Sequence, residues 1–297
     1  MKVGKGFKPL GITYTNDPEI VAEWISYVRQ ASPVKTLGID TETKPSRRKA
    51  RPGKVAKGPD VLQLSTCEEC LVLQLSSVQH RKHKSKMQRA LGPLLRNGSI
   101  LKAGVGIDDD ALKLWWATGG QYEIRGRLDL GGIGCKHLNR GLASVTEAVL
   151  GVKMEKPKRI IKSNWAAPAP TLLSLEQVRY AAMDAWAGAA VHAELSRRRP
   201  DLFARNKQRV TCPNGIPKNE RSLQDILNRR LLRQKLLAEL KNLKKYYDAV
   251  YKDENGEFFE YIDEDAEEEI EKLKNAISSL QHDKALYFSP KALGLSE

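Results

Sequence analysis

The stretch VKTLGIDTETKP, residues 34–45, runs from apolar residues directly into two acids that are separated by one threonine. The segment from Thr36 to Ile39 has the short apolar composition of a buried strand. Side chains at positions i and i+2 of a strand point to the same face, so Asp40 and Glu42 would project together from its carboxyl end. Two adjacent carboxylates repel each other unless a positive charge lies between them. The pair is therefore either a solvated strand end or part of a cation site.

The sequence around this strand predicts an α/β domain with a mixed sheet flanked by helices. Two apolar runs, at 60–66 and 71–75, are separated by a tight polar turn and predict an antiparallel hairpin. Further strands are expected at 34–41, 99–106 and 127–134, and helices at 16–30, 87–97, 108–118, 142–151 and 174–199. Ser174 and Gln177 have the spacing of a capping box at the start of the last helix.

The net charge of +14 favours a polyanionic partner. The excess is clustered in three segments that flank the acidic strand ends, which indicates a phosphate-bearing substrate. A solvated face or a localisation signal is the alternative interpretation. The clusters are Lys44, Arg47, Arg48, Lys49, Arg51, Lys54 and Lys57; Arg81, Lys82, Lys84, Lys86 and Arg89; and Lys153, Lys156, Lys158, Arg159 and Lys162.

The composition also indicates the cellular compartment in which the protein is expected. No apolar run approaches the roughly 20 residues that cross a bilayer, and the first 15 residues lack the apolar core of a secretory signal. Four cysteines in 297 residues do not form a disulfide framework. We therefore expect an intracellular protein without membrane association, in the nucleus rather than the cytoplasm.

Acidic residues recur at two other predicted element ends. Asp108, Asp109 and Asp110 stand where a strand passes into a helix, and Asp184 lies in the small and apolar surroundings of RYAAMDAWAG. A carboxylate on a buried helix needs a partner, which a metal ion would supply. Tyr180 precedes Asp184 by four residues and shares its helical face. Hard dications take oxygen ligands, a pair of them assists phosphodiester cleavage, and a tyrosine hydroxyl could orient the attacking water.

Three segments, GIDTE, KAGVGIDDDALKLW and YAAMDAWAG, resemble in this order the three motifs of the DEDDy 3′–5′ exonucleases. The resemblance extends over about residues 10–200, includes KSNW and LSLEQVRYAA before the last acid, and is to the branch of the Werner-syndrome helicase exonuclease, with ribonuclease D more distant. It implies an RNase H-like fold, two divalent cations (Mg²⁺ or Mn²⁺), and removal of nucleotides from the 3′ end of nucleic acid, with DNA favoured.

Carried over motif by motif, the resemblance implies four metal-ligating carboxylates and one catalytic tyrosine: Asp40, Glu42, Asp110 and Asp184, with Tyr180. Asp108 is then expected to cap the helix, with Asp109 a solvated neighbour. Lys44 stands where many relatives have an aromatic residue, and AAPAPTLLS departs from the usual Arg-Pro-Leu after the tryptophan. These departures concern substrate positioning rather than the chemistry.

The composition changes after Arg199 and Pro200, which predicts a nuclease domain at 1–204 followed by a linker and a charged helical extension at 205–297. A basic helix is expected from 221 to 247, with a leucine stripe formed by Leu223, Ile226, Leu227, Leu231, Leu236, Leu240 and Leu243. Eleven acids and no Lys or Arg lie between Asp253 and Glu271, and a further helical pattern follows. We expect the two helices to fold back on each other; a partly disordered tail is the alternative. The stripe requires a partner surface, which could be a protein partner or a second subunit.

Three other functions fit the same residues. One is an RNA exonuclease of the ribonuclease D kind, because residue types do not reveal a contact to the 2′-hydroxyl. Another is a nucleic-acid-binding scaffold with a nuclease-like fold, which would be marked by loss of one of the four acids; all four are present. The last is a protein whose C-terminal extension is the functional part.

Overall fold

The computed structural model describes residues 1, 6–31, 35–45, 58–77, 81–132, 141–166, 172–198, 200, 223–250, 268 and 270–276. These residues fall into two compact units, of which one ends at Leu223 and the other begins at Gln224. The predicted basic loop, at 46–57, the predicted domain boundary after residue 204, and the acidic stretch at 253–267 lie outside the described residues.

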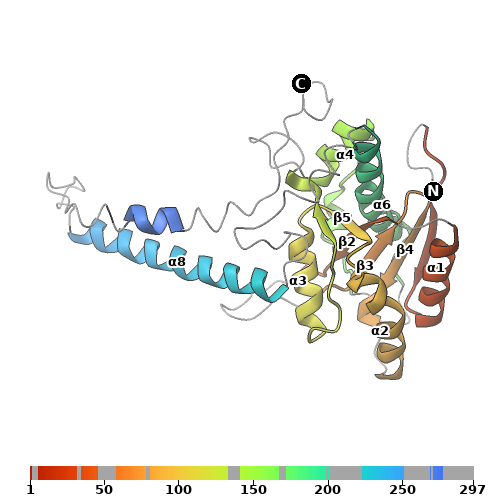
Figure 1. Ribbon diagram of the computed structural model, residues 1–297, viewed down its shortest axis with the longest axis horizontal. Coiled ribbons are helices and arrows are strands. Elements are labelled where there is room, and N and C mark those ends of the chain that lie inside the picture. The colour runs from red at the N-terminus through yellow and green to blue at the C-terminus, as the bar shows by residue number, and fades with distance from the viewer. Residues whose placement is uncertain are drawn as a thin grey trace. The chain divides into compact units, whose positions relative to one another are not determined.

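A six-stranded mixed sheet forms the centre of the first unit, with the strand order β1-β4-β3-β2-β5-β6 (Figure 1). The strands are β1 (Gly11–Thr15), β2 (Thr36–Glu42), β3 (Val61–Ser65), β4 (Glu69–Gln74), β5 (Leu101–Gly104) and β6 (Arg127–Asp129). Strand β3 runs antiparallel to β2 and β4, whereas the other pairs are parallel. The predicted hairpin and mixed sheet are confirmed. The sequence analysis did not predict β1, which extends the sheet beyond the hairpin.

Six helices accompany this sheet in the described part of the first unit: α1 (Pro18–Ala31), α2 (Arg81–Arg96), α3 (Ile107–Ala117), α4 (Leu142–Leu150), α5 (Lys158–Ile161) and α6 (Leu175–Arg198). Asp17 caps α1 by accepting a hydrogen bond from the Glu19 amide at 2.8 Å. Helix α2 begins six residues before the predicted start at 87, so the second basic cluster lies on the helix itself. The single turn α5 was not predicted.

Helix α6 covers one face of the sheet and contacts β2, β3, β4 and β5. Cys70 and Val72 of β4 share a buried cluster with Ala182 and Trp186 of this helix. The intervening β4 residues, such as Leu71, point to the other face because side chains alternate along a strand. Helices α1 and α2 pack on each other, and α1 also contacts β1 and β4.

Two glycines let α6 approach the sheet closely. A Cβ atom at Gly38 of β2 would lie 2.6 Å from the backbone nitrogen of Ala189 and closer still to the Ala185 carbonyl oxygen. A Cβ at Gly188 would collide with the carbonyl oxygen of Ala103 on β5 and would lie 3.3 Å from the Gly38 Cα. The contact also fixes the orientation of β2: Gly38 faces α6, and the residues two and four positions later therefore face it too.

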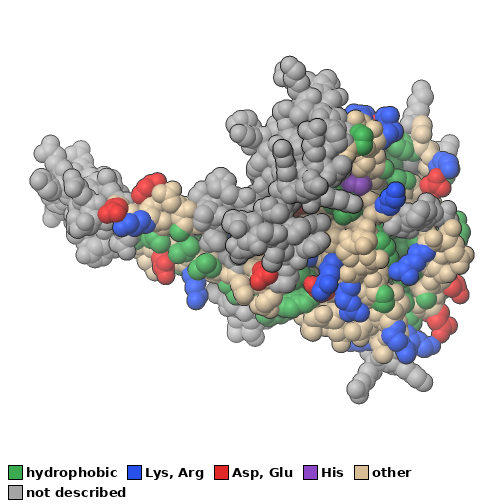
Figure 2. Space-filling model, viewed as in Figure 1, with side chains coloured by type: hydrophobic (Ala, Val, Ile, Leu, Met, Phe, Trp, Pro, Cys, Tyr) green, Lys and Arg blue, Asp and Glu red, His purple; other side chains and the backbone are tan. Residues whose placement is uncertain are grey.

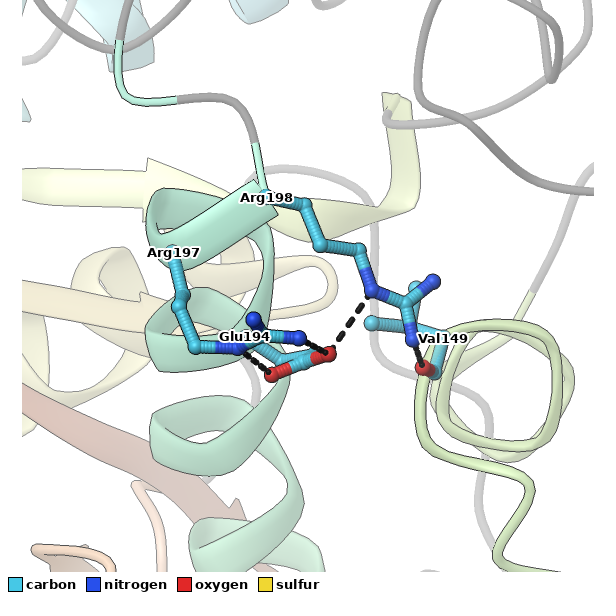
Figure 3. Close-up of polar contacts among 4 residues, drawn as sticks. All are labelled: Val149, Glu194, Arg197 and Arg198. Atoms are coloured by element: carbon cyan, nitrogen blue, oxygen red, sulfur yellow. Dashed lines mark hydrogen bonds and ion pairs between the residues drawn. The ribbon is translucent and has the colours of Figure 1, made fainter.

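The C-terminal end of α6 is tied to α4 by polar contacts (Figure 3). Glu194 accepts hydrogen bonds from Arg197 at 2.8 and 2.9 Å and from Arg198 at 2.7 Å. Arg198 also donates to the Val149 carbonyl at 3.0 Å, and Val149 shares an apolar cluster with Leu195 of α6. This end of the helix is thereby anchored, while the middle of the helix lies over β2.

The second unit contains most of α8 (Leu223–Val250) and the helical residues 270–276. The predicted basic helix is confirmed as a helix. Within its leucine stripe, Leu236, Leu240 and Leu243 are half-buried, whereas Leu231 is 44% exposed. The expected packing of the two helices against each other stays a prediction. None of the described helices combines the length and apolar character that a bilayer crossing requires.

Candidate active site

Asp40 and Glu42 lie at the carboxyl end of β2, which is hydrogen-bonded to β3 on one side and to β5 on the other. Asp40 and Glu42 are two and four residues after Gly38, so their side chains point to the same face of β2 as Gly38, toward α6. The sequence predicted that the two acids share a face. In the antiparallel pairing, Asp40 stands opposite Gln63 of β3 and Glu42 opposite Val61.

Asp184 reaches this pair from the middle of α6. The helix begins with the predicted capping box. The backbone N–H of Gln177 donates to Ser174 Oγ at 3.2 Å, and the backbone N–H of Ser174 donates to Gln177 Oε1 at 2.9 Å. The Asp184 side chain is only 3% exposed. One carboxylate oxygen from each of Asp40, Glu42 and Asp184 lies within 4.8 Å of the others.

Asp110 lies in the first turn of α3 and is held to the same strand end. It accepts a hydrogen bond from Thr41 Oγ1 at 2.7 Å, and the Lys113 ammonium lies 3.4 Å from the same oxygen. Thr41 is the residue between Asp40 and Glu42. Asp110 is outside the group of three mutually close carboxylates, but its charge is near enough to raise the pKa of Asp40.

Asp108 does not cap α3, so that prediction was wrong. The N-cap is Gly106, which has a φ of 72° and makes no side-chain capping bond. Asp108 instead accepts a hydrogen bond from Arg127 Nε at 2.8 Å. The Arg127 side chain is 2% exposed and also donates to the Ile124 carbonyl, so Asp108 neutralises a buried cation on the neighbouring strand β6.

Tyr180 lies one helical turn before Asp184, close enough for its hydroxyl to lower the pKa of the Asp184 carboxyl. The ring centroid is 6.0 Å from that of Trp165, in a tilted arrangement. The ammonium of Lys156 lies 5.4 Å from the same ring centroid. Burial raises the pKa of Tyr180, and the charge of Asp184 raises it further. The hydroxyl is therefore neutral at physiological pH.

Burial and mutual repulsion raise the pKa values of the acids in the site. Burial raises the pKa of Asp40 well above its usual value, and the charges of Asp184, Asp110 and Glu42 add to this effect. Burial, followed by the charge of Asp184, raises the pKa of Glu42 to about 8. Burial also raises the pKa of Asp184, against the opposing effect of the Lys156 ammonium. The acids outnumber the lysines beside them, and a crowded set of oxygen donors with excess negative charge fits a hard divalent cation.

Two residues of the site were not assigned to it from the sequence. Lys156 Nζ donates to both oxygens of Asp184, at 2.8 and 2.9 Å. Gln63 is fully buried beside Asp40, and among the described residues its side-chain amide has no hydrogen-bond partner. Lys156 stood in a recognised basic cluster, but nothing local ties it to an acid 28 residues away. For Gln63, the available signal was a polar residue inside the apolar hairpin strand VLQLS.

The 3′–5′ exonuclease family model matches residues 12–199 of the chain. A 3′–5′ exonuclease from Arabidopsis thaliana is 34% identical over 164 residues, which cover 54% of this chain and 52% of that protein. The bifunctional 3′–5′ exonuclease/ATP-dependent helicase WRN of Mus musculus is 30% identical over 204 residues, which cover 65% of this chain and 14% of that protein. The match thus spans about half the length of the Arabidopsis relative.

Among solved structures, the Nibbler EXO domain of Aedes aegypti aligns with a TM-score of 0.51 at 17% identity, over 66% of this chain and 92% of that domain. This likeness confirms the predicted fold. The matched family region contains Asp40, Glu42, Asp110 and Asp184, and it covers more than half of the chain. Sequence motifs, fold and acidic site agree, and the chain belongs to the 3′–5′ exonuclease family.

Proposed function

We propose that this chain is a metal-dependent exonuclease that removes nucleotides from the 3′ end of nucleic acid by hydrolysing phosphodiester bonds. The observation that carries this proposal is the convergence of Asp40, Glu42 and Asp184, whose carboxylate oxygens lie within 4.8 Å of one another. Membership of the 3′–5′ exonuclease family supports the reaction and its direction.

The residues that would hold the cations are Asp40, Glu42, Asp184 and Asp110. Four carboxylates balance the charge of two Mg²⁺ or Mn²⁺ ions, which supports a pair rather than a single ion. When bound, such a pair supplies positive charge that stabilises the attacking and leaving oxygens of a phosphodiester displacement. The chain contributes the arrangement of these donors, because β2, α3 and α6 bring the four carboxylates to one end of the sheet.

Tyr180 is proposed to orient the attacking water. Because its pKa is raised, the hydroxyl keeps its proton and acts through hydrogen bonding rather than as a base. Its place one helical turn before Asp184 puts it beside the carboxylates. The nearby Trp165 ring, 6.0 Å away, restricts the orientation of the phenol.

The substrate is proposed to be single-stranded DNA or the 3′ ends of duplex DNA. The net charge of +14 supports a phosphate backbone as ligand. Figure 2 shows Lys and Arg side chains spread over the drawn face of the first unit. Exposed Lys158 and Lys162 lie on and directly after α5, which contacts the helix that carries Asp184. DNA is favoured over RNA on the motif resemblance.

The test is a gel time course on 3′- and 5′-labelled DNA and RNA, single-stranded and duplex, with Mg²⁺, Mn²⁺ or EDTA. The expected result is metal-dependent shortening from the 3′ end, faster on DNA than on RNA and lost in Asp184→Asn. Faster digestion of RNA would replace the DNA assignment with an exoribonuclease of the ribonuclease D type. Binding without any cleavage would contradict the enzyme and leave a nucleic-acid-binding scaffold.

We further propose that the protein acts in the nucleus and that the C-terminal helices bind a protein partner or a second copy of the chain. The leucines exposed on α8, including Leu231 and Leu232, support an interaction surface. Light scattering coupled to size exclusion measures self-association, and imaging of the tagged full chain measures the compartment. A monomer that captures no partner would contradict the proposed interaction surface. A protein excluded from the nucleus would contradict the proposed compartment.

A further inference from the structure

Lys156 connects a surface segment to the most buried acid of the site. It lies in residues 151–157, which join α4 to α5 and contain neither helix nor strand. Its side chain is 33% exposed, whereas that of Asp184 is 3% exposed. The ammonium donates to both Asp184 oxygens, at 2.8 and 2.9 Å. A cation carried on a surface segment thus neutralises a carboxylate from the solvent side.

The same ammonium lies beside the whole group of three close carboxylates. It bonds to both oxygens of Asp184, and one oxygen of each of Asp40, Glu42 and Asp184 lies within 4.8 Å of the others. Lys113 is a second lysine near the acids, and its ammonium lies 3.4 Å from Asp110. A protein is strongly destabilised when a buried carboxylate has no counterion. While no divalent cation is bound, Lys156 is the counterion of Asp184.

A dication and this ammonium compete for the same oxygens. Lys156 is bonded to both Asp184 oxygens, so a metal ion on Asp184 would lie next to the ammonium. Two adjacent cations repel each other, which favours displacement of the ammonium when the metal binds. Lysine suits such displacement because its charge sits on a flexible four-carbon stem. The Tyr180 ring, whose centroid is 5.4 Å from Nζ, attracts the ammonium without using a metal ligand.

We propose that Lys156 is a tethered counterion that exchanges with a divalent cation on Asp184. Lys156 holds the acidic cluster together in the metal-free protein and leaves Asp184 when the metal binds. This inference rests on the proposed function, because it takes Asp184 to be a metal ligand. It makes Lys156 a positioning residue that sets the metal affinity of the site, and it predicts that removing a positive charge improves metal binding.

The test is a titration of the full chain with Mn²⁺ alone, followed by the EPR signal of unbound Mn²⁺ in the absence of nucleic acid. We expect Lys156→Met to lower the Kd for Mn²⁺ about tenfold, the effect of removing a contacting charge. Lys156→Arg should raise it, because a bidentate guanidinium binds a carboxylate more firmly than an ammonium does. The matched control is Lys158→Met, which removes the same charge from an exposed neighbour.

Thermal unfolding gives a second readout. In EDTA, Lys156→Met should melt at a lower temperature than the wild type, and saturating Mn²⁺ should remove most of the difference. A Kd for Lys156→Met that equals or exceeds the wild-type value, or that shifts no more than in Lys158→Met, would overturn the exchange and leave the nuclease proposal intact. The converse result is that the wild type and the two Lys156 variants bind Mn²⁺ in the expected order of affinities while the wild type cleaves no nucleic acid. That result would overturn the nuclease proposal alone.

Discussion

Asp108 and Asp110 lie two residues apart on α3 and have different partners. Asp110 accepts a hydrogen bond from Thr41, between the two acids of β2. Asp108 is paired with Arg127, whose side chain is buried. Consecutive helical residues are rotated by about 100°, so two positions apart face nearly opposite directions. One run of three acids is therefore divided between the candidate active site and the packing of α3 on β6.

Exchanging each of these acids for its amide should separate the two roles. Asp110→Asn should slow turnover by at least about 10²-fold, because loss of even a supporting partner of a metal site costs about 10–100-fold. Asp108→Asn should leave turnover at saturating metal nearly unchanged but lower the free energy of unfolding by about 1–3 kcal/mol, since the buried Arg127 loses the charge of Asp108. Exonuclease rates and urea unfolding measure the two effects. An inactive but fully stable Asp108→Asn protein would shift the second motif by two residues.

Tyr180→Phe tests the hydroxyl separately from the carboxylates. The variant keeps the ring beside Trp165 and Lys156 but loses the hydroxyl that lies near Asp184. We expect Mn²⁺ to bind within a few-fold of the wild-type affinity while turnover falls by about 10²–10⁴-fold, the range typical of a proton-transfer or orienting group. Single-turnover kinetics at saturating Mn²⁺ measure this loss. Full activity of the variant would remove Tyr180 from the chemistry.

At the scale of elements, the distance between α6 and the sheet controls the site. Gly38 and Gly188 have no Cβ atoms, which allows the helix backbone to approach β2 and β5. Asp184 lies one turn before Gly188 on this helix. Because the close approach brings the Asp184 carboxylate to Asp40 and Glu42, the packing of two backbones determines where the donors meet.

Gly188→Ala should therefore harm both stability and activity. The added methyl would collide with the backbone carbonyl of Ala103, and overpacking of this kind costs about 1–3 kcal/mol. The matched control is Gly92→Ala in α2, where the new Cβ would meet only the end of the flexible Arg96 side chain, at 3.2 Å. There, alanine should cost less stability than at position 188, because no backbone atom opposes the new methyl; the usual gain of a helical alanine is not expected, since Pro93 follows and disfavours the helical conformation of a preceding residue that carries a Cβ. Chemical unfolding and Mn²⁺ titration provide the comparison; a Gly188→Ala protein as stable as the wild type would contradict the packing argument.

At the scale of the whole molecule, the acids of the site make the stability of the metal-free protein depend on pH. The pKa of Glu42 is raised from 4.5 to about 8 in the folded protein. Between these values the folded state holds more protons than the unfolded state, so this residue destabilises the protein increasingly as pH rises. His192 and Lys102 have lowered pKa values, at about 4 and about 7, and act in the opposite direction.

A comparison of Glu42→Gln with the wild type in EDTA isolates this effect, because the opposing groups are common to both proteins. Glu42→Gln should be the more stable, by an amount that grows from pH 5 to pH 8 and reaches about 1–3 kcal/mol. Saturating Mg²⁺ or Mn²⁺ should reverse the order, since the wild type alone keeps the full set of carboxylates. Urea unfolding at several pH values measures the difference. An advantage that shrinks as pH rises would contradict the raised pKa.

Local periodicity in the sequence was sufficient to determine several features of the fold and the site. A period of two places Asp40 and Glu42 on one face of β2, and helical spacing places Tyr180 beside Asp184. The capping box at Ser174 is likewise a local contact between residues three positions apart. Each of these features depends on the backbone conformation of one segment, which its own residues specify.

Other features required the tertiary structure because their partners are distant in the chain. Strand β1 is five residues long, and its neighbour β4 follows more than fifty residues later. Asp108 forms an ion pair with Arg127 instead of capping α3, and Lys156 donates hydrogen bonds to both oxygens of Asp184. Residue types and spacing identify charges that need partners, but they do not specify which opposite charge is brought within about 3 Å. The packing of α3 and α6 against the sheet makes that choice, and with it the composition of the candidate active site.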